Sequence, residues 1–147
     1  MIINRKAWIV VADGGRANVY ENVGEIGELK LALVRSSSQD TGHTHELGRD
    51  KPGRMNDNSG YSKSALESTN IHEVAEDRFL KGVMDHLAQD VQSGECAEVI
   101  LIAPPQALGD LRKHLPANVA KVVVGEIGKD YTHVTVNELQ KTLMHIT

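Results

Sequence analysis

Short apolar runs separated by glycine-rich breaks fill the first 35 residues of the chain. Residues 7–12 (Ala-Trp-Ile-Val-Val-Ala) are rich in β-branched side chains and end at Asp13-Gly14-Gly15, which predicts a buried strand and a tight turn. Because Asp-Gly and Gly-Gly supply the positive φ angles that hairpin turns demand, residues 16–22 are predicted to return as an antiparallel strand. In residues 28–34 leucines occupy every second position, which predicts a third strand and completes a three-stranded meander.

Residues 36–70 have no hydrophobic period, and serines, glycines, a proline and scattered charges occupy them. Structureless segments of this length inside a compact domain are generally either functional or mobile. We therefore expect a long, mobile loop that carries function, with an insertion of no role as the alternative.

From Ile71 the period changes to that of a helix. Apolar residues recur at spacings of three and four as far as Val91, which is the stripe of an amphipathic helix. Ser68 or Asn70 could cap the start of this helix and Gly94 could close its end.

Two buried strands and two more helices are predicted in the remainder. Residues 99–103 are apolar throughout, as is typical of a central strand, and Pro104-Pro105 ends that strand and can open a helix. Residues 122–124 predict another buried strand, and residues 135–138 have the pattern of a capping box before a last helix.

The resulting order, β-β-β-α-β-α-β-α, predicts a single α/β domain over residues 1–147. We expect a five-stranded mixed sheet with helices on both of its faces. The same order is that of ribonuclease-H-like folds.

The composition is that of an ordinary globular domain. The chain has 147 residues, of which 40% are hydrophobic and 24% charged, and a formal net charge of −4. No secretory signal is expected, because Met1-Ile2-Ile3 is followed at once by Asn4-Arg5-Lys6. No apolar run approaches the roughly 20 residues that span a bilayer, and the lone Cys96 fits a reducing compartment. These features predict a cytoplasmic protein outside the membrane.

Acidic residues are concentrated in one segment of an otherwise balanced chain. Residues 71–95 hold Arg78 and Lys81 against Glu73, Glu76, Asp77, Asp85, Asp90 and Glu95. No strongly basic face is visible, and aromatic residues make up only 3% of the chain, too few for a stacking platform. Composition alone therefore does not support nucleic-acid binding.

A metal-dependent nuclease needs several carboxylates that converge from strand ends and the first helix. Asp13 ends the first strand, and Glu73, Glu76 or Asp77 lies in the predicted helix. The fourth strand, however, ends in Ala103-Pro104-Pro105 without an acid. A turn role explains Asp13 more simply, so the nuclease stays a minor alternative.

Histidines offer a second candidate site. His43 and His45, beside Glu46, could hold a metal with His72, but a His-X-His pair without a third ligand at a defining spacing favours solvated side chains. The other histidines, at positions 86, 114, 133 and 145, are predicted to lie on the surface. Cys96 precedes a buried strand, which favours a buried, inert thiol. No catalytic residue, metal or cofactor is predicted.

Four segments of the chain resemble a bacterial family named for attachment to host cells. They are residues 8–21, 75–79, 99–112 and 125–132, in the same order. That family is similar to the middle domain of archaeal and eukaryotic class I release factors, which has a ribonuclease-H-like sheet.

In those release factors the loop between the third strand and the first helix carries a Gly-Gly-Gln tripeptide that enters the peptidyl transferase centre. Here the corresponding residues 36–70 contain Gly48-Arg49 and Gly53-Arg54 but no Gly-Gly-Gln, so the resemblance does not imply peptidyl-tRNA hydrolysis. It implies a loop that reaches into RNA, for which the candidate binding residues are His43, His45, Arg49, Lys51, Arg54 and Lys63.

The resemblance therefore favours a non-enzymatic, translation-associated protein that binds RNA, the ribosome or a protein partner through residues 36–70. The alternatives are a hydrolase of the peptidyl-tRNA or ester type, and an interaction module that forms a homodimer through the strand near residues 28–34.

Overall fold

The computed structural model describes residues 2–39 and 65–146, with side chains of the second range from residue 71 onward. The elements follow the chain as β1 (Trp8–Ala12), β2 (Arg16–Asn22), β3 (Leu31–Ser38), α2 (Ala65–Gln92), β5 (Val99–Ile102), α3 (Pro105–Lys113), α4 (Ala117–Ala120), β6 (Val123–Ile127) and α5 (Val136–Ile146).

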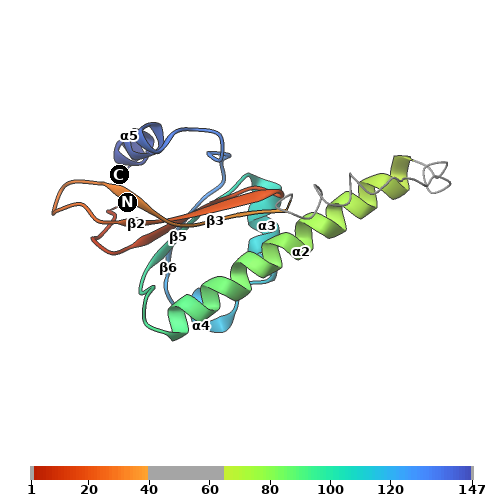
Figure 1. Cartoon of the computed structure of the whole chain (residues 1–147), viewed down its shortest axis with the longest axis horizontal. Helices are drawn as coiled ribbons and strands as arrows, with labels where there is room; N and C mark the ends of the chain where they lie inside the picture. Colours follow the sequence, from red (N-terminus) through yellow and green to blue (C-terminus); the bar gives the residue numbers. More distant parts are fainter. Residues whose placement is uncertain (1, 40–64, 147) are drawn as a thin grey trace.

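The five strands form one mixed sheet in the order β3-β2-β1-β5-β6 (Figure 1). The pairs β1–β2 and β2–β3 are antiparallel, whereas β1–β5 and β5–β6 are parallel. The predicted meander and the predicted mixed sheet are thereby confirmed, with β1 at the centre of the sheet.

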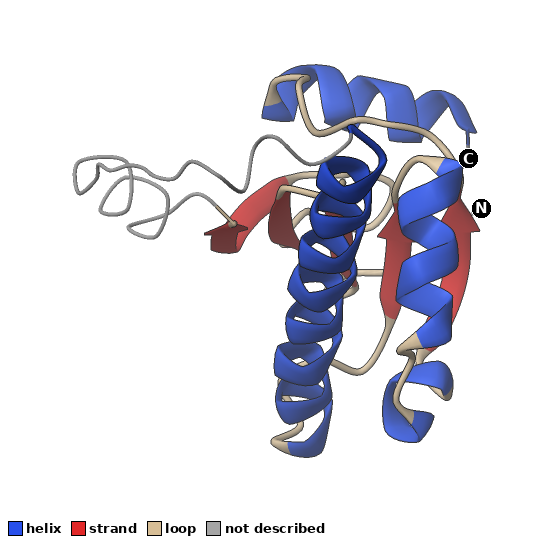
Figure 2. Ribbon diagram, turned by 90° about the vertical axis from the view of Figure 1, so that its right-hand side faces the viewer, coloured by secondary structure: helices blue, strands red, loops and turns tan. Residues whose placement is uncertain are grey.

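Helices cover both faces of the sheet, as predicted (Figure 2). Alternate residues of β1 point to opposite faces of the sheet. Trp8 and Val10 pack against α2, α3 and α4, whereas Ile9 and Val11 pack against Leu139 and Leu143 of α5. The two apolar layers make the domain a three-layer sandwich around β1 and β5.

The first long helix and the third strand both extend further than the sequence pattern predicts. Helix α2 begins at Ala65 rather than Ile71, so Ser68 and Asn70 lie inside the helix and cannot cap it. Strand β3 begins at Leu31 rather than at residue 28, and it continues to Ser38, because residues 36–38 pair with residues 16–18 of β2 through their backbones. The expected loop over residues 36–70 is therefore shorter at both ends, and its residues 40–64 lie outside the described part of the chain.

The last strand differs from its prediction. Residues 122–124 were expected to be buried, but β6 lies at the edge of the sheet and the side chain of Val124 is 50% exposed. A short apolar run is the same in a central strand and in an edge strand, so the sequence pattern does not separate the two. The structure also adds the short helix α4, which the pattern did not predict.

The predicted helix ends of the C-terminal half are confirmed. Pro105 occupies the first turn of α3, and Gly94 has a φ of +86° just beyond α2. Thr135 and Glu138 form the capping box of α5, with the backbone N–H of each donating to the side chain of the other at 2.9 and 3.1 Å. In the part of the chain that the structure describes, no helix has the length and apolarity needed to cross a membrane.

Candidate functional site

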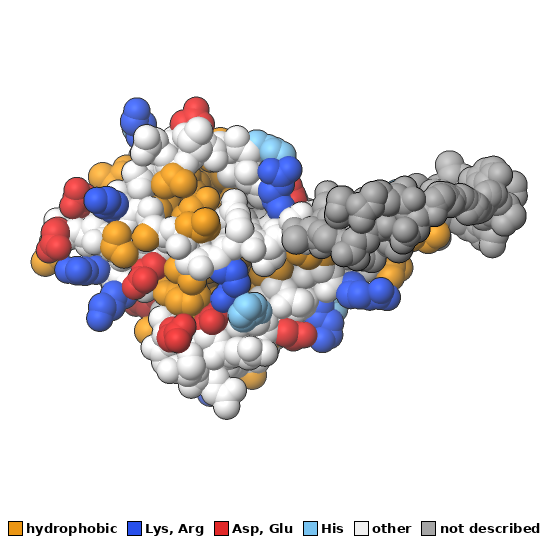
Figure 3. All heavy atoms as spheres, in the orientation of Figure 1, with side chains coloured by type: hydrophobic (Ala, Val, Ile, Leu, Met, Phe, Trp, Pro, Cys, Tyr) orange, Lys and Arg blue, Asp and Glu red, His pale blue; other side chains and the backbone are white. Residues whose placement is uncertain are grey.

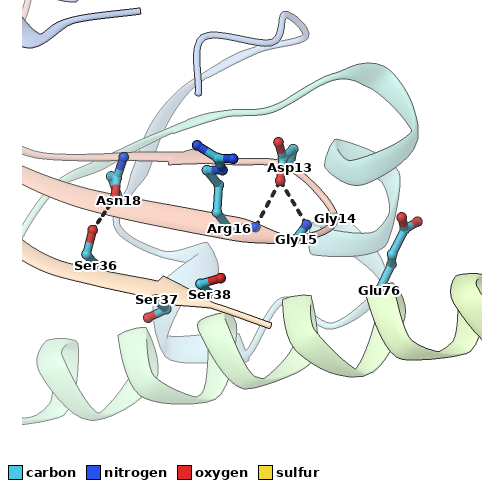
Figure 4. Close-up of a pocket in the computed structure, with 9 residues that line it drawn as sticks. All are labelled: Asp13, Gly14, Gly15, Arg16, Asn18, Ser36, Ser37, Ser38 and Glu76. Carbon is cyan, nitrogen blue, oxygen red and sulfur yellow. Dashed lines mark hydrogen bonds between the residues drawn. The ribbon is translucent and has the colours of Figure 1, made fainter. Parts of the chain in front are cut away.

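A polar cavity lies where β1 ends, between the β1–β2 turn, the end of β3 and α2 (Figure 4). We call it the carboxyl-end pocket. Its volume is about 860 Å³, and apart from two glycines every lining residue is polar: Asp13, Gly14, Gly15, Arg16, Asn18, Ser36, Ser37, Ser38 and Glu76. In sheets with parallel strands the carboxyl ends of the strands are the usual place for a ligand.

The β1–β2 turn is held by the side chain of Asp13. Its Oδ1 accepts hydrogen bonds from the backbone N–H groups of Gly15 at 2.8 Å and Arg16 at 2.9 Å. This confirms Asp13 as a turn residue. Because only Oδ1 accepts these turn bonds, the second carboxylate oxygen of Asp13, Oδ2, is available for contacts outside the turn.

The two glycines of this turn serve a purpose other than the predicted one. Neither Gly14 nor Gly15 has a positive φ, so the turn does not need their left-handed freedom. Instead, a Cβ atom at Gly14 would lie 2.6 Å from Cδ of Glu76, which reaches over from α2. A side chain at position 14 would therefore require the flexible Glu76 side chain to move, a tertiary contact that no local pattern encodes.

The wall of the pocket formed by β2 and β3 is fixed by polar contacts. The hydroxyl of Ser36 donates to the amide oxygen of Asn18. Beyond the strand end, Gln39 donates its backbone N–H to the carbonyl of Gly15 at 2.9 Å and its side-chain N–H to that of Gly14 at 2.7 Å. These bonds hold the end of β3 against the turn.

A second polar group adjoins the pocket from the segment after β6. The hydroxyl of Thr132, which is buried, lies 3.0 Å from Oδ2 of Asp13 and 2.6 Å from Oδ1 of Asp130. Since a hydroxyl carries one hydrogen, it donates to one of these carboxylates at a time. Hydrogen bonds from the hydroxyl and backbone N–H of Thr132, helped by the nearby His133 and Arg16, hold the pKa of Asp130 below its ordinary value.

Asp13, Asp130 and His133 could together hold a divalent cation, because one ligand atom from each lies within 4.8 Å of the others. Sequence reasoning missed Asp130 and Thr132 and assigned His133 to the surface without a role. The available signal was a polar run after a predicted strand, at the same edge of the sheet as Asp13.

The acids considered for a nuclease separate in the folded protein. Glu76 lines the carboxyl-end pocket together with Asp13. Asp77 instead faces α3, where it contacts Nζ of Lys113 at 2.8 Å and Nε2 of His114 at 2.9 Å. His114 is thus half-buried and paired, whereas the sequence placed it on the surface.

The six predicted binding residues, His43, His45, Arg49, Lys51, Arg54 and Lys63, lie outside the described residues, and their role stays a prediction. His72 is described and exposed, and it does not line the carboxyl-end pocket. Cys96 is buried as predicted, and burial, together with the charge of Asp90, raises the pKa of its thiol to about 11.

Comparison with known proteins now identifies the family. The family described as "Protein required for attachment to host cells" matches residues 8–143. The chain belongs to this family. Over 102 residues, or 67% of the chain, it is 26% identical to "Uncharacterized protein RP470" from Rickettsia prowazekii (strain Madrid E), 68% of which is covered.

A solved structure of an archaeal protein shares the fold of this family member. An archaeal translation termination factor, aRF1, matches 95% of the chain with a TM-score of 0.50 and 12% sequence identity. A second structure, titled "Archaeal protein", matches 95% of the chain with a TM-score of 0.48 and 12% identity. The chain spans 36% of the termination factor, so it corresponds to one part of that protein, and it spans 40% of the other protein. Both parts of the resemblance stated above are confirmed.

Proposed function

We propose that this protein is a non-enzymatic, translation-associated protein of the cytoplasm that binds RNA of the ribosome. In this proposal the contact is made at the carboxyl-end pocket and through residues 36–70, with the cations and histidines from His43 to Lys63 meeting the RNA. We further infer that the sheet is of the ribonuclease-H-like type, because three antiparallel strands precede two parallel ones.

One observation carries the proposal: the polar groups of the carboxyl-end pocket lie at the end of the domain where β3 finishes and from which α2 projects (Figure 1). Hydroxyls of β3, the Asn18 amide and the Arg16 guanidinium are donors of the kind that bind phosphate and ribose oxygens. The likeness of the fold to part of a translation termination factor supports the ribosome as the place of binding.

Sedimentation with ribosomes tests the proposal. The wild-type chain is expected to pellet with ribosomes at low salt, and a variant lacking residues 43–60 is expected to stay in the supernatant. Arg16→Glu should also weaken the association. The matched control is Arg5→Glu, which makes the same charge change at an exposed residue beside Glu25, away from the pocket. Equal recovery of all four proteins would refute the proposal.

A second candidate function, metal-dependent hydrolysis of an ester or of RNA, is favoured by the Asp13–Asp130–His133 cluster. It predicts that Mn²⁺ binds the wild-type chain in calorimetry and that Asp130→Asn and His133→Ala each remove this binding. Asp13 is a poor choice for this test because it also holds the turn. No heat of Mn²⁺ binding to the wild-type chain would eliminate the metal-dependent hydrolase.

A homodimer is the third candidate, through the edge strand β3. Leu33 and Val34 on β3 are 58% and 40% exposed, and among the described residues no strand pairs with its outer edge, where the backbone N–H of Leu31 donates to Gln140 of α5. Light scattering on the wild-type chain and on Leu33→Lys decides this: a dimer that Leu33→Lys dissociates is expected, and a monomeric wild type refutes it.

A further inference from the structure

A second hollow lies on the helical face of the sheet, between α2 and the strands β2 and β3. We call it the α2–β3 groove. Its volume is about 270 Å³, and it is lined on one side by Ala17, Val19, Arg35 and Ser37 and on the other by residues 78–86 of α2. In the space-filling view, basic, acidic, histidine and apolar side chains lie next to one another near the middle of the face that is shown (Figure 3).

The groove is open because α2 has a glycine in its middle. A Cβ atom added at Gly82 would meet nothing within 4 Å, so the residue is not a glycine for lack of space. Glycine in a helix interior costs about 1 kcal/mol relative to alanine. Its effect here is to leave the helix backbone accessible between Arg78 and His86, one turn away on either side.

Helix α2 carries more acidic than basic residues, but several of its acids are paired with cations of the same protein. Asp85 pairs with Lys81 at 2.9 Å, and Asp90 pairs with Arg35 at 2.7 Å. Asp77 is engaged on the other side of the helix by α3. Three of the acids that argued against RNA binding are therefore neutralised by cations of the same protein.

The remaining groups of the groove are donors. Arg78 and His86 have no carboxylate partner among the described residues, and the same part of the structure offers no hydrogen-bond partner for the hydroxyl of Ser37. A guanidinium, an imidazole N–H and a hydroxyl that line one hollow can donate to the oxygens of a phosphate and a ribose.

The floor of the groove is apolar. Ala17, Val19 and Val83 are buried beneath it, and Phe79 is half-buried at its side. An aromatic ring and aliphatic groups beside a set of phosphate-binding donors form a surface on which a nucleobase can lie. A protein segment would use the apolar floor but would leave Arg78 without a counter-charge unless it carried an acid.

We propose that the α2–β3 groove binds one nucleotide of a single-stranded RNA, with the phosphate on Arg78 and His86, the ribose near Ser37 and the base against Phe79. The proposal rests on the proposed function, since it names a site at which the RNA is held. It places part of the RNA contact on the folded domain, in addition to residues 36–70.

Binding of a fluorescein-labelled, single-stranded RNA of about twelve nucleotides, followed by anisotropy, tests the groove. Arg78→Glu is expected to weaken binding about tenfold or more. Gly82→Leu should do the same by placing a bulky side chain at the hollow, and it should fold because a Cβ atom at position 82 meets nothing within 4 Å and leucine is the better helix former. Arg5→Glu makes the matched charge change on an exposed residue that does not line the groove, and should stay within about threefold of wild type.

A further variant measures the phosphate contact itself. Arg78→Ala should lower the slope of log affinity against log salt by about 0.7, the value for one phosphate of a single strand. Thermal unfolding of each variant checks that the fold is retained.

The outcomes separate this inference from the proposed function. If the wild-type chain binds RNA and Arg78→Glu and Gly82→Leu bind it equally well, the groove is not the site and the proposed function stands. If the wild-type chain pellets with ribosomes but has no affinity for the oligonucleotide, the inference alone fails. If Gly82→Leu abolishes ribosome binding without changing oligonucleotide binding, the groove holds a ribosomal protein and the inference is overturned. If the wild-type chain binds neither ribosomes nor RNA, both proposals fail.

Discussion

Gly14 in the β1–β2 turn lies so close to Glu76 of α2 that a Cβ atom at position 14 would be 2.6 Å from Cδ of the glutamate. The contact joins residues from the first hairpin and the long helix at the carboxyl-end pocket. It gives the glycine a tertiary role, because the φ angle at this position is not positive.

Replacement of Gly14 by alanine should therefore displace the Glu76 side chain rather than strain the turn. We expect the free energy of unfolding to fall by about 1 kcal/mol, a modest overpacking cost. In a Glu76→Ala background the same substitution should cost nothing, since the overlapping atoms are gone. Urea denaturation of the four proteins measures the coupling. An equal cost in both backgrounds would show that the turn, not Glu76, requires the glycine.

The ion pair between Arg35 of β3 and Asp90 of α2 joins the edge of the sheet to the helix. The side chains are only 19% and 11% exposed, and the Nη2–Oδ2 distance is 2.7 Å. Arg35→Ala should destabilise the fold by about 3 kcal/mol, because it leaves a largely buried carboxylate unpaired. Arg5→Ala breaks the exposed pair with Glu25 and should cost about 0.5 kcal/mol or less. Chemical denaturation measures the free energy of unfolding of both variants. Similar losses of stability would contradict the inference that burial makes the Arg35–Asp90 pair the more important one.

Acid should weaken the contact between α2 and α3. Lys113 and then His114, both hydrogen-bonded to Asp77, hold the pKa of this carboxyl below its ordinary value of 3.8. A lowered folded-state pKa stabilises the fold at pH values above 3.8, and that contribution is lost as the pH falls through the folded-state value. Thermal unfolding between pH 6 and pH 2 should therefore show a smaller acid-induced loss of stability in Asp77→Asn than in wild type. Parallel curves for the two proteins would rule out this contribution.

Cys96 should be inert in the folded protein. Burial and the neighbouring Asp90 raise the pKa of its thiol to about 11, so at pH 8 about one molecule in a thousand carries the reactive thiolate. Iodoacetamide should label the chain slowly under native conditions and rapidly in urea, as mass spectrometry can follow. Fast labelling of the native protein would mean that the thiol is more accessible than its buried position indicates.

The sequence by itself determined the elements that depend on local chemistry. Continuous β-branched runs predicted β1 and β5, the spacing of three and four predicted α2, and Pro105, Gly94 and the Thr135–Glu138 capping box marked helix ends. These features follow from backbone geometry and from neighbours a few residues away, so the sequence alone is enough to predict them. The family resemblance could also be found from the sequence, because it depends on contiguous segments.

Only the tertiary structure decided which strands are edges, why Gly14 is a glycine, and that Asp130 and His133 lie beside Asp13. It also decided that three acids of α2 are paired with Lys81, Arg35 and Lys113, and that Arg78 faces a groove. Each of these facts depends on atoms brought together from distant parts of the chain. A charge count or a hydrophobic period records which side chains are present, whereas pairing and burial depend on which of them the packed sheet and helices place within a few ångströms of one another.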